Sequence, residues 1–246
     1  MTEIPTRMAK NTTRSVAIVG AFGGIGRSIV SSFSDVAVEL LLSANSRYDE
    51  LVRYAERASS SPGFSIKTFR ADLSKTSDVR RLADEWTNGV NLDSLIVASG
   101  IDLMAPENKA LNFDERLARA WQIDVASTLA LARTIGADMA RRRRDGADPC
   151  FRPSIVLFGW DGASRGQEGE TAQIYATCKG AVVAFAKSLA QELAPHVRVN
   201  VVSPGWIRTT WGAEASDAAN RRAVDESLAK RWGTPEEVAR VVRFLV

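Results

Sequence analysis

Short apolar runs alternate with longer stretches in which apolar residues recur at helical spacing. The runs predict strands at 15–19, 38–43, 64–70, 92–98, 154–158 and 198–202. The longer stretches predict helices at 27–35, 47–58, 77–87, 113–144, 173–193 and 235–246. Strands that are continuously apolar and separated by helices are typical of a parallel sheet covered on both faces. We therefore expect one doubly wound, Rossmann-type α/β domain over 15–246, preceded by a flexible tail at 1–14.

A glycine-rich loop lies between the first predicted strand and the first predicted helix. Residues 20–26 read Gly-Ala-Phe-Gly-Gly-Ile-Gly, so that Gly20, Gly24 and Gly26 follow a Gly-x-x-x-Gly-x-Gly spacing. Glycines here permit a tight turn and a close backbone approach to a pyrophosphate, and the helix start offers N–H donors to it. The strand-loop-helix context favours a dinucleotide site over an ordinary glycine-rich turn.

The second chemical feature is a tyrosine and a lysine on one predicted helix. Tyr175 and Lys179 are four residues apart, which places them on the same helix face. A nearby ammonium favours the phenolate, so we expect Lys179 to lower the pKa of Tyr175 from its usual value of about 10. The pair would then serve as a proton donor or acceptor near neutral pH.

Together these elements resemble the classical short-chain dehydrogenase/reductase family, and within it the 3-oxoacyl-carrier-protein reductase-like members. Two further stretches carry the likeness, Ala71-Asp72-Leu73 and the Pro-Gly-x-x-x-Thr element that begins at Pro204. The resemblance implies a nicotinamide cofactor. It assigns to cofactor binding Gly20, Phe22, Gly24, Ile25, Gly26, Asn45, Arg47, Asp72, Leu73, Ser99, Gly100, Tyr175, Lys179, Pro204, Gly205, Ile207 and Thr209.

The end of the second strand predicts which nicotinamide cofactor binds. NAD sites place a carboxylate there for the ribose hydroxyls. This chain has Asn45 and Arg47, and its first acid is Asp49. A guanidinium suits a 2′-phosphate, so we favour NADP(H) over NAD(H). The alternative is that Arg47 only begins a solvated helix.

The chain departs from the family in its catalytic set. The family's serine position falls on Trp160 when counted from the fifth strand and on Gly162 when counted back from Tyr175, and neither carries a hydroxyl. Asp161 and Ser164 are the nearest candidates to orient the substrate. The family's relay asparagine is replaced by Asp124, whose carboxylate would stabilise the Lys179 ammonium but oppose a tyrosinate at Tyr175.

A substrate lid is expected at about 206–231, and Trp160, Ser164, Trp206 and Trp211 are predicted to line the substrate pocket. The predicted function is an NAD(P)H-dependent ketoreductase or alcohol dehydrogenase. Its substrate would be a small carbonyl or alcohol, such as a 3-oxoacyl or polyketide-like compound that is free or carrier-bound. Two alternatives stay open: a nucleotide-binding regulator or scaffold without turnover, and a dehydratase or epimerase on the same fold.

The amino-acid composition argues against several other classes of protein and of binding partner. The 246 residues are 45% hydrophobic with a net charge of +3, two cysteines and one histidine, which is typical of a globular domain. The slight excess of basic residues does not indicate that the protein binds nucleic acid. Because cysteine and histidine are scarce, we expect no metal site. No apolar run is long enough for a bilayer. We expect a cytoplasmic homodimer or homotetramer that binds neither nucleic acid nor membrane.

Overall fold

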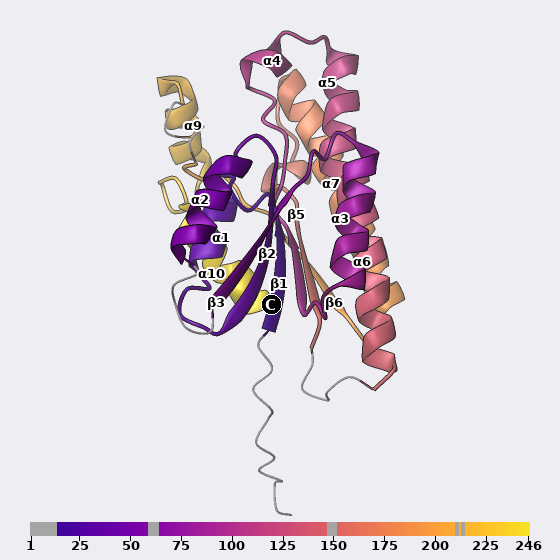
Figure 1. The fold of residues 1–246 in the computed structure, drawn as a ribbon. Helices are drawn as coiled ribbons and strands as arrows, with labels where there is room; N and C mark the ends of the chain where they lie inside the picture. The colour runs from indigo at the N-terminus through magenta and orange to yellow at the C-terminus, as the bar shows by residue number, and fades with distance from the viewer. Residues whose placement is uncertain (1–13, 59–63, 147–151, 210–211, 213–214) are drawn as a thin grey trace, which may run out of the picture.

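The computed structural model describes residues 14–58, 64–146, 152–209, 212 and 215–246. Its strands form one parallel sheet in the order β3-β2-β1-β4-β5-β6 (Figure 1). They are β1 (Arg14–Val19), β2 (Val38–Ala44), β3 (Phe64–Arg70), β4 (Ser94–Val97), β5 (Ser154–Phe158) and β6 (Arg198–Val202). In the middle of the sheet, Ile18 pairs with Leu42 on one side and Ile96 on the other, and all three are fully buried. The predicted doubly wound parallel sheet is confirmed.

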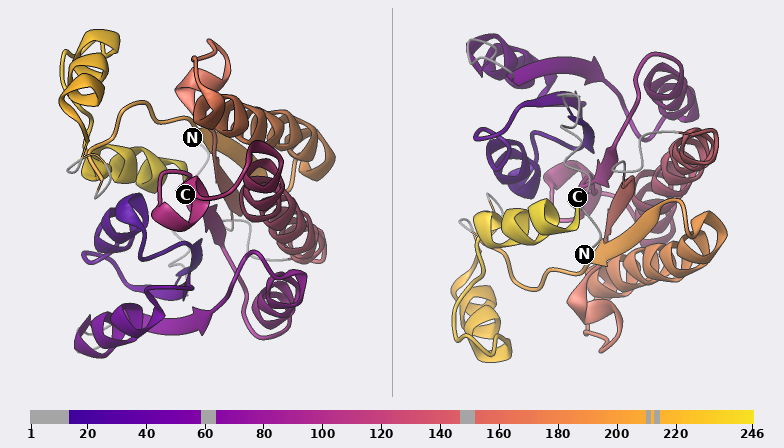
Figure 2. Two further views of the ribbon diagram at one scale, coloured as in Figure 1. Left: turned by 90° about the horizontal axis from the view of Figure 1, so that it is seen from above. Right: turned by 90° about the horizontal axis from the view of Figure 1, so that it is seen from below.

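Helices cover both faces of this sheet, as the end-on views of Figure 2 show. The longer helices are α1 (Gly24–Ser31), α2 (Tyr48–Ala58), α3 (Thr76–Asn88), α5 (Phe113–Ala120), α6 (Ser127–Arg144), α7 (Glu170–Leu193), α9 (Asp217–Glu226) and α10 (Pro235–Leu245). One buried cluster joins the sheet to α3, α6 and α7 through residues such as Trp86, Leu131 and Val182. A second joins it to α1, α2 and α10 through Ile29, Leu51 and Val242.

The predicted bounds of the N-terminal tail and of two helices were wrong by a few residues. The tail prediction extends one residue too far because Arg14 already pairs with Val38 in β1, and residues 1–13 lie outside the described residues. The first helix is displaced toward the glycine loop and begins at Gly24. The helix predicted at 173 begins at Glu170, because its polar first turn carries no apolar periodicity.

The helix expected as one piece at 113–144 contains a change of winding. Between α5 and α6, residues Trp121–Ala126 form a π-helical segment. Such single π turns occur often at functional sites. Here the segment carries Asp124, which is 1% exposed. Among the described residues, no helix is both long enough and apolar enough to cross a bilayer.

Candidate active site

The glycine loop connects β1 to α1 in a shape that side chains would block. Gly20 has a φ of +76°, a region that glycine enters without strain. A Cβ on Gly26 would lie 2.1 Å from the Gly20 carbonyl oxygen, and a Cβ on Gly24 would lie 2.6 Å from Thr209. The bare backbone therefore forms a cradle at the start of α1, closed on its far side by the segment after β6.

A buried hydroxyl without a partner lies next to this cradle. Ser99 follows β4, and a Cβ on Gly20 would lie 2.7 Å from its backbone. Within the described residues, the buried Ser99 Oγ has no hydrogen-bond partner. A polar ligand at the cradle would supply one, since buried hydroxyls are normally paired. The cradle and this hydroxyl fit the phosphate and ribose groups of a dinucleotide.

The end of β2 carries a positively charged cluster. The Phe22 ring is 4% exposed. The Arg27 and Arg47 guanidinium carbons lie 4.8 and 5.7 Å from its centroid. Arg47 also binds Glu50 through two nitrogens, at 2.6 and 2.9 Å. Asn45 is exposed at the same edge, whereas Leu73 at the end of β3 is buried beside the half-buried Asp72.

Tyr175 and Lys179 lie on one face of α7, as expected, and Asp124 completes a trio in which the lysine and the aspartate are buried. The Lys179 ammonium is 3.6 Å from an Asp124 carboxylate oxygen and 5.3 Å from the Tyr175 ring centroid. The other Asp124 oxygen accepts a hydrogen bond from the Ile101 N–H at 2.9 Å. A Cβ on Gly100 would come within 3.4 Å of Asp124, so that glycine lets the trio approach the chain after β4.

The charge balance of this trio corrects the expected direction for Tyr175. Burial raises the pKa of Tyr175 above its usual value, and Asp124 raises it further, while Lys179 acts in the opposite direction. Burial alone would lower the pKa of Lys179, but Asp124 and Tyr175 outweigh burial and raise it. The sequence prediction counted the ammonium and the opposing carboxylate but not burial, which is the largest influence on this pKa. In this structure the phenol holds its proton and the lysine holds its charge.

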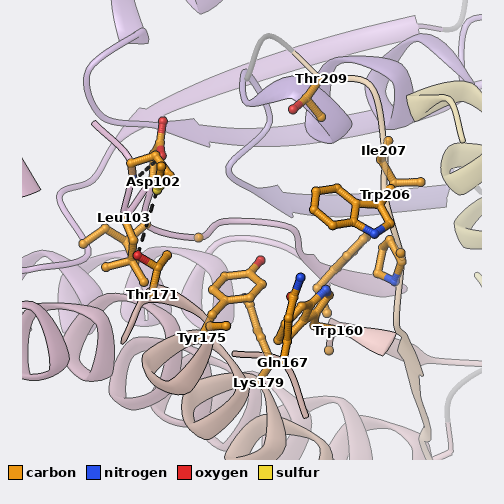
Figure 3. A pocket seen from close by; sticks show the side chains of 18 of the residues that line it. Asp102, Leu103, Trp160, Gln167, Thr171, Tyr175, Lys179, Trp206, Ile207 and Thr209 are labelled. Carbon is orange, nitrogen blue, oxygen red and sulfur yellow. Dashed lines mark hydrogen bonds between the residues drawn. The ribbon is translucent and has the colours of Figure 1, made fainter. Parts of the chain in front are cut away.

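Tyr175 and Lys179 face one cavity of about 730 Å³. Figure 3 shows the Tyr175 hydroxyl pointing into open space, with Thr171 on one side and Trp160 and Trp206 on the other. The predicted site residues that line the cavity are Ile25, Ser99, Gly100, Trp160, Tyr175, Lys179, Pro204, Gly205, Trp206, Ile207 and Thr209. The structure thus brings Tyr175, Lys179 and one end of the glycine loop to the same space.

Comparison with known proteins identifies the family to which this chain belongs. Residues 20–246 match the family model described as enoyl-(acyl carrier protein) reductase. The chain belongs to the short-chain dehydrogenase/reductase family. It is 30% identical to the uncharacterized oxidoreductase YmfI of Bacillus subtilis over 242 residues, covering 95% of this chain and 91% of the relative.

Two further relatives agree with this membership. The 3-oxoacyl-[acyl-carrier-protein] reductase FabG of Aquifex aeolicus is 27% identical, with 93% of this chain and 88% of that protein covered. A crystal structure of a short-chain dehydrogenase/reductase from Brucella melitensis, titled glucose/ribitol dehydrogenase, is 31% identical with a TM-score of 0.75. That match covers 94% of this chain and 88% of the other.

The two residues that were predicted to replace the family serine, Asp161 and Ser164, lie outside the large cavity. Asp161 belongs to a short 3-10 turn, and its carboxylate binds the Arg165 guanidinium at 2.7 Å. The Ser164 hydroxyl donates to the Asp161 carbonyl oxygen at 3.3 Å. Neither lines the large cavity; Asp161 and Arg165 line a smaller one of about 210 Å³. Trp160 lines both, and Trp211 lies outside the described residues.

The sequence did not predict one side of the large cavity, which is lined by Arg116, Thr171 and Met104. Arg116 of α5 is 8% exposed. It donates to the Thr171 hydroxyl at 2.6 Å, and both residues line the cavity with Met104. An arginine on a polar helix ordinarily faces solvent, so nothing in the local pattern identified it. Thr171 is one turn before Tyr175 on α7, and that spacing was the only available signal.

Proposed function

We propose that this protein is an NADP(H)-dependent carbonyl reductase or alcohol dehydrogenase in which Tyr175 transfers the proton. The observation that carries the proposal is the trio of Tyr175, Lys179 and Asp124, in which Tyr175 and Lys179 line a cavity that Ile25 at the end of the glycine loop also lines. The relatives named above include an oxidoreductase and a 3-oxoacyl reductase, which favours the same reaction class.

The roles of the side chains follow from their charges. The nicotinamide supplies or accepts the hydride when it is bound. Tyr175, whose raised pKa keeps the phenol protonated, donates its proton to the substrate oxygen during reduction. Lys179 stabilises the phenolate that remains, because its ammonium lies over the same ring. Asp124 holds that ammonium in place and keeps it charged.

The preference for NADP(H) rests on the residues near the carboxyl end of β2. Arg27 and Arg47 flank Phe22 there, and Asn45 stands where an NAD site carries an acid. Arg47 is bound to Glu50 in this structure. A 2′-phosphate would offer the guanidinium a doubly charged partner of matching geometry in place of that carboxylate.

The substrate class is proposed from the cavity wall and the relatives. Ile101, Leu103 and Met104 give the space beyond Tyr175 an apolar side, which suits an acyl chain. One relative acts on 3-oxoacyl groups of a carrier protein, so we propose a 3-oxoacyl or polyketide-like carbonyl, free or carrier-bound. We also propose a homodimer or homotetramer, since Val241 and Phe244 expose 48% and 85% of their surface on α10.

The proposal is tested by following nicotinamide oxidation with NADPH and a panel of 3-oxo esters and thioesters. Wild-type protein should turn over at least one of them, and Tyr175→Phe should lose most of that rate while still binding NADPH. Equal rates in the two proteins would contradict the role of Tyr175. NADPH binding without turnover across the panel would instead favour a nucleotide-binding regulator.

A further inference from the structure

The indole of Trp160 stands beside the proton donor. Trp160 follows β5 after one residue and lines the large cavity together with Tyr175. The two ring centroids are 5.4 Å apart, with an interplanar angle of 63°. Figure 3 shows the Trp160 indole on the side of Tyr175 that faces Trp206, next to the space into which the phenol hydroxyl points. The indole thus borders the place where a substrate oxygen would meet Tyr175.

Two glycines hold this indole in position. A Cβ on Gly162 would lie 2.4 to 2.6 Å from three carbons of the Trp160 ring, so the bare backbone at 162 packs directly against the indole. A Cβ on Gly159 would lie 2.5 Å from the Ser203 hydroxyl, so the start of the loop packs closely on the chain after β6. The ring thus packs against Gly162 and against Tyr175, and such packing preorganises a donor.

The N–H of this indole is available for a ligand. Among the described residues, no hydrogen bond is made by the Trp160 indole, and its side chain is only partly buried. The neighbouring Trp206 differs, because its N–H donates to Glu226 at 2.8 Å. Asp161, the adjacent candidate, is paired with Arg165. Of Trp160, Asp161 and Trp206, Trp160 is therefore the one whose side chain offers the cavity an N–H donor without a partner among the described residues.

We propose that the Trp160 N–H donates a hydrogen bond to the substrate's carbonyl oxygen, beside the phenol of Tyr175. This inference rests on the proposed reductase function. As hydride reaches the carbonyl carbon, the C=O π pair moves onto oxygen and the Tyr175 proton joins it. The indole only donates, so it gains and loses no proton and stabilises the negative charge that develops. An ionised carboxylate at Asp161 would repel that charge.

The first test compares Trp160→Phe with wild-type protein in NADPH-dependent reduction of ethyl acetoacetate, or of the best substrate of the panel. Phenylalanine keeps an aromatic ring against Tyr175 and Gly162 and removes the N–H. Loss of one oxyanion donor lowers kcat by about 10²-fold in comparable sites, and we expect a fall of that order with little change in KM. Trp121→Phe is the matched control, because Trp121 is 45% exposed and outside the cavity; it should keep the wild-type rate.

A second pair of variants covers the case in which phenylalanine disturbs folding. Trp160→Gln keeps an N–H donor on a side chain that reaches about as far from the backbone as the indole nitrogen, whereas Trp160→Met of similar length has no donor. We expect the glutamine variant to be at least ten-fold faster than the methionine variant at equal NADPH binding. Equal rates in that pair, or a wild-type rate in Trp160→Phe, would overturn the inference while leaving the reductase function intact. A wild-type protein that reduces no carbonyl would overturn both.

Discussion

At the scale of single residues, the unusual feature is a full ion pair beside Tyr175, the proposed proton donor. Lys179 and Asp124 are 3% and 1% exposed, and their charged atoms are 3.6 Å apart. Taking either partner away leaves a buried charge uncompensated, which costs more than the pair itself contributes. Asp124 also accepts from the Ile101 N–H. The carboxylate therefore connects α7 to the chain after β4.

We expect Asp124→Ala to lower the free energy of unfolding by about 3–5 kcal/mol, because it strands the Lys179 ammonium and the Ile101 N–H. Asp124→Asn keeps an acceptor for that N–H and should cost less. Urea denaturation of the three proteins at neutral pH measures the difference. Equal stability of the alanine variant and wild type would show that the ammonium finds another partner.

The second residue-scale prediction concerns the pKa of Tyr175. Burial and Asp124 raise it, so the phenol should ionise above its usual value of about 10. Its acid function should persist as pH rises and disappear only once pH exceeds that raised pKa. Asp124→Asn removes one of the raising charges, and the midpoint should move to lower pH while Lys179 is still charged.

An ultraviolet titration of tyrosinate in the protein without cofactor, taken as wild type minus Tyr175→Phe, isolates this one phenol from Tyr48 and Tyr54. A midpoint below the value of free tyrosine would contradict the prediction. A midpoint unchanged by Asp124→Asn would show that burial alone sets it.

At the scale of elements, the turn from β1 into α1 depends on the absence of side chains. Gly26→Ala would place a Cβ 2.1 Å from the Gly20 carbonyl oxygen, so the loop must shift. We expect NADPH binding, measured by nucleotide fluorescence, to weaken at least ten-fold. Gly180→Ala in α7 is the control: a Cβ there meets nothing within 4 Å. It should leave NADPH binding unchanged and stabilise the helix by about 0.5–1 kcal/mol.

The same elements show which parts of the fold and the site can be predicted from the sequence. Buried parallel strands are apolar along their whole length, so the strands around Ile18, Leu42 and Ile96 could be predicted, and with them the fold. Tyr175 and Lys179 could be placed together because helical spacing fixes their common face. Helical periodicity gives no warning of the π segment at Asp124, since its residues continue the same pattern. The pairing of Asp161 with Arg165 depends on how the loops pack, and so does the exposure of the Trp160 and Trp206 rings. No local sequence pattern predicts that packing.

At the scale of the whole molecule, the cofactor cradle is assembled from distant parts of the chain. Gly24 at the start of α1 approaches Thr209 beyond β6, and the chain after β4 places Ser99 against Gly20. A ligand that binds across these segments binds only the folded protein. Its binding free energy is then added to the stability of the fold.

Cofactor preference can therefore be measured as thermal stability, independently of any substrate. At a concentration 100 times its Kd, a ligand contributes about 2.7 kcal/mol, which raises the Tm of a protein of this size by about 5–11 °C. We expect NADPH to produce such a rise, and NADH at the same concentration a smaller one.

The difference between the two cofactors should come from Arg47. Arg47→Ala removes a guanidinium that a 2′-phosphate would bind, so the NADPH shift should fall toward the NADH shift, which itself should not change. Arg57→Ala, an exposed position on helix α2, which begins directly after Arg47, controls for loss of one positive charge in that region and should preserve the difference. A larger shift with NADH in wild-type protein would reverse the assigned preference. An undiminished NADPH shift in Arg47→Ala would transfer the phosphate contact to Arg27, the other guanidinium against Phe22.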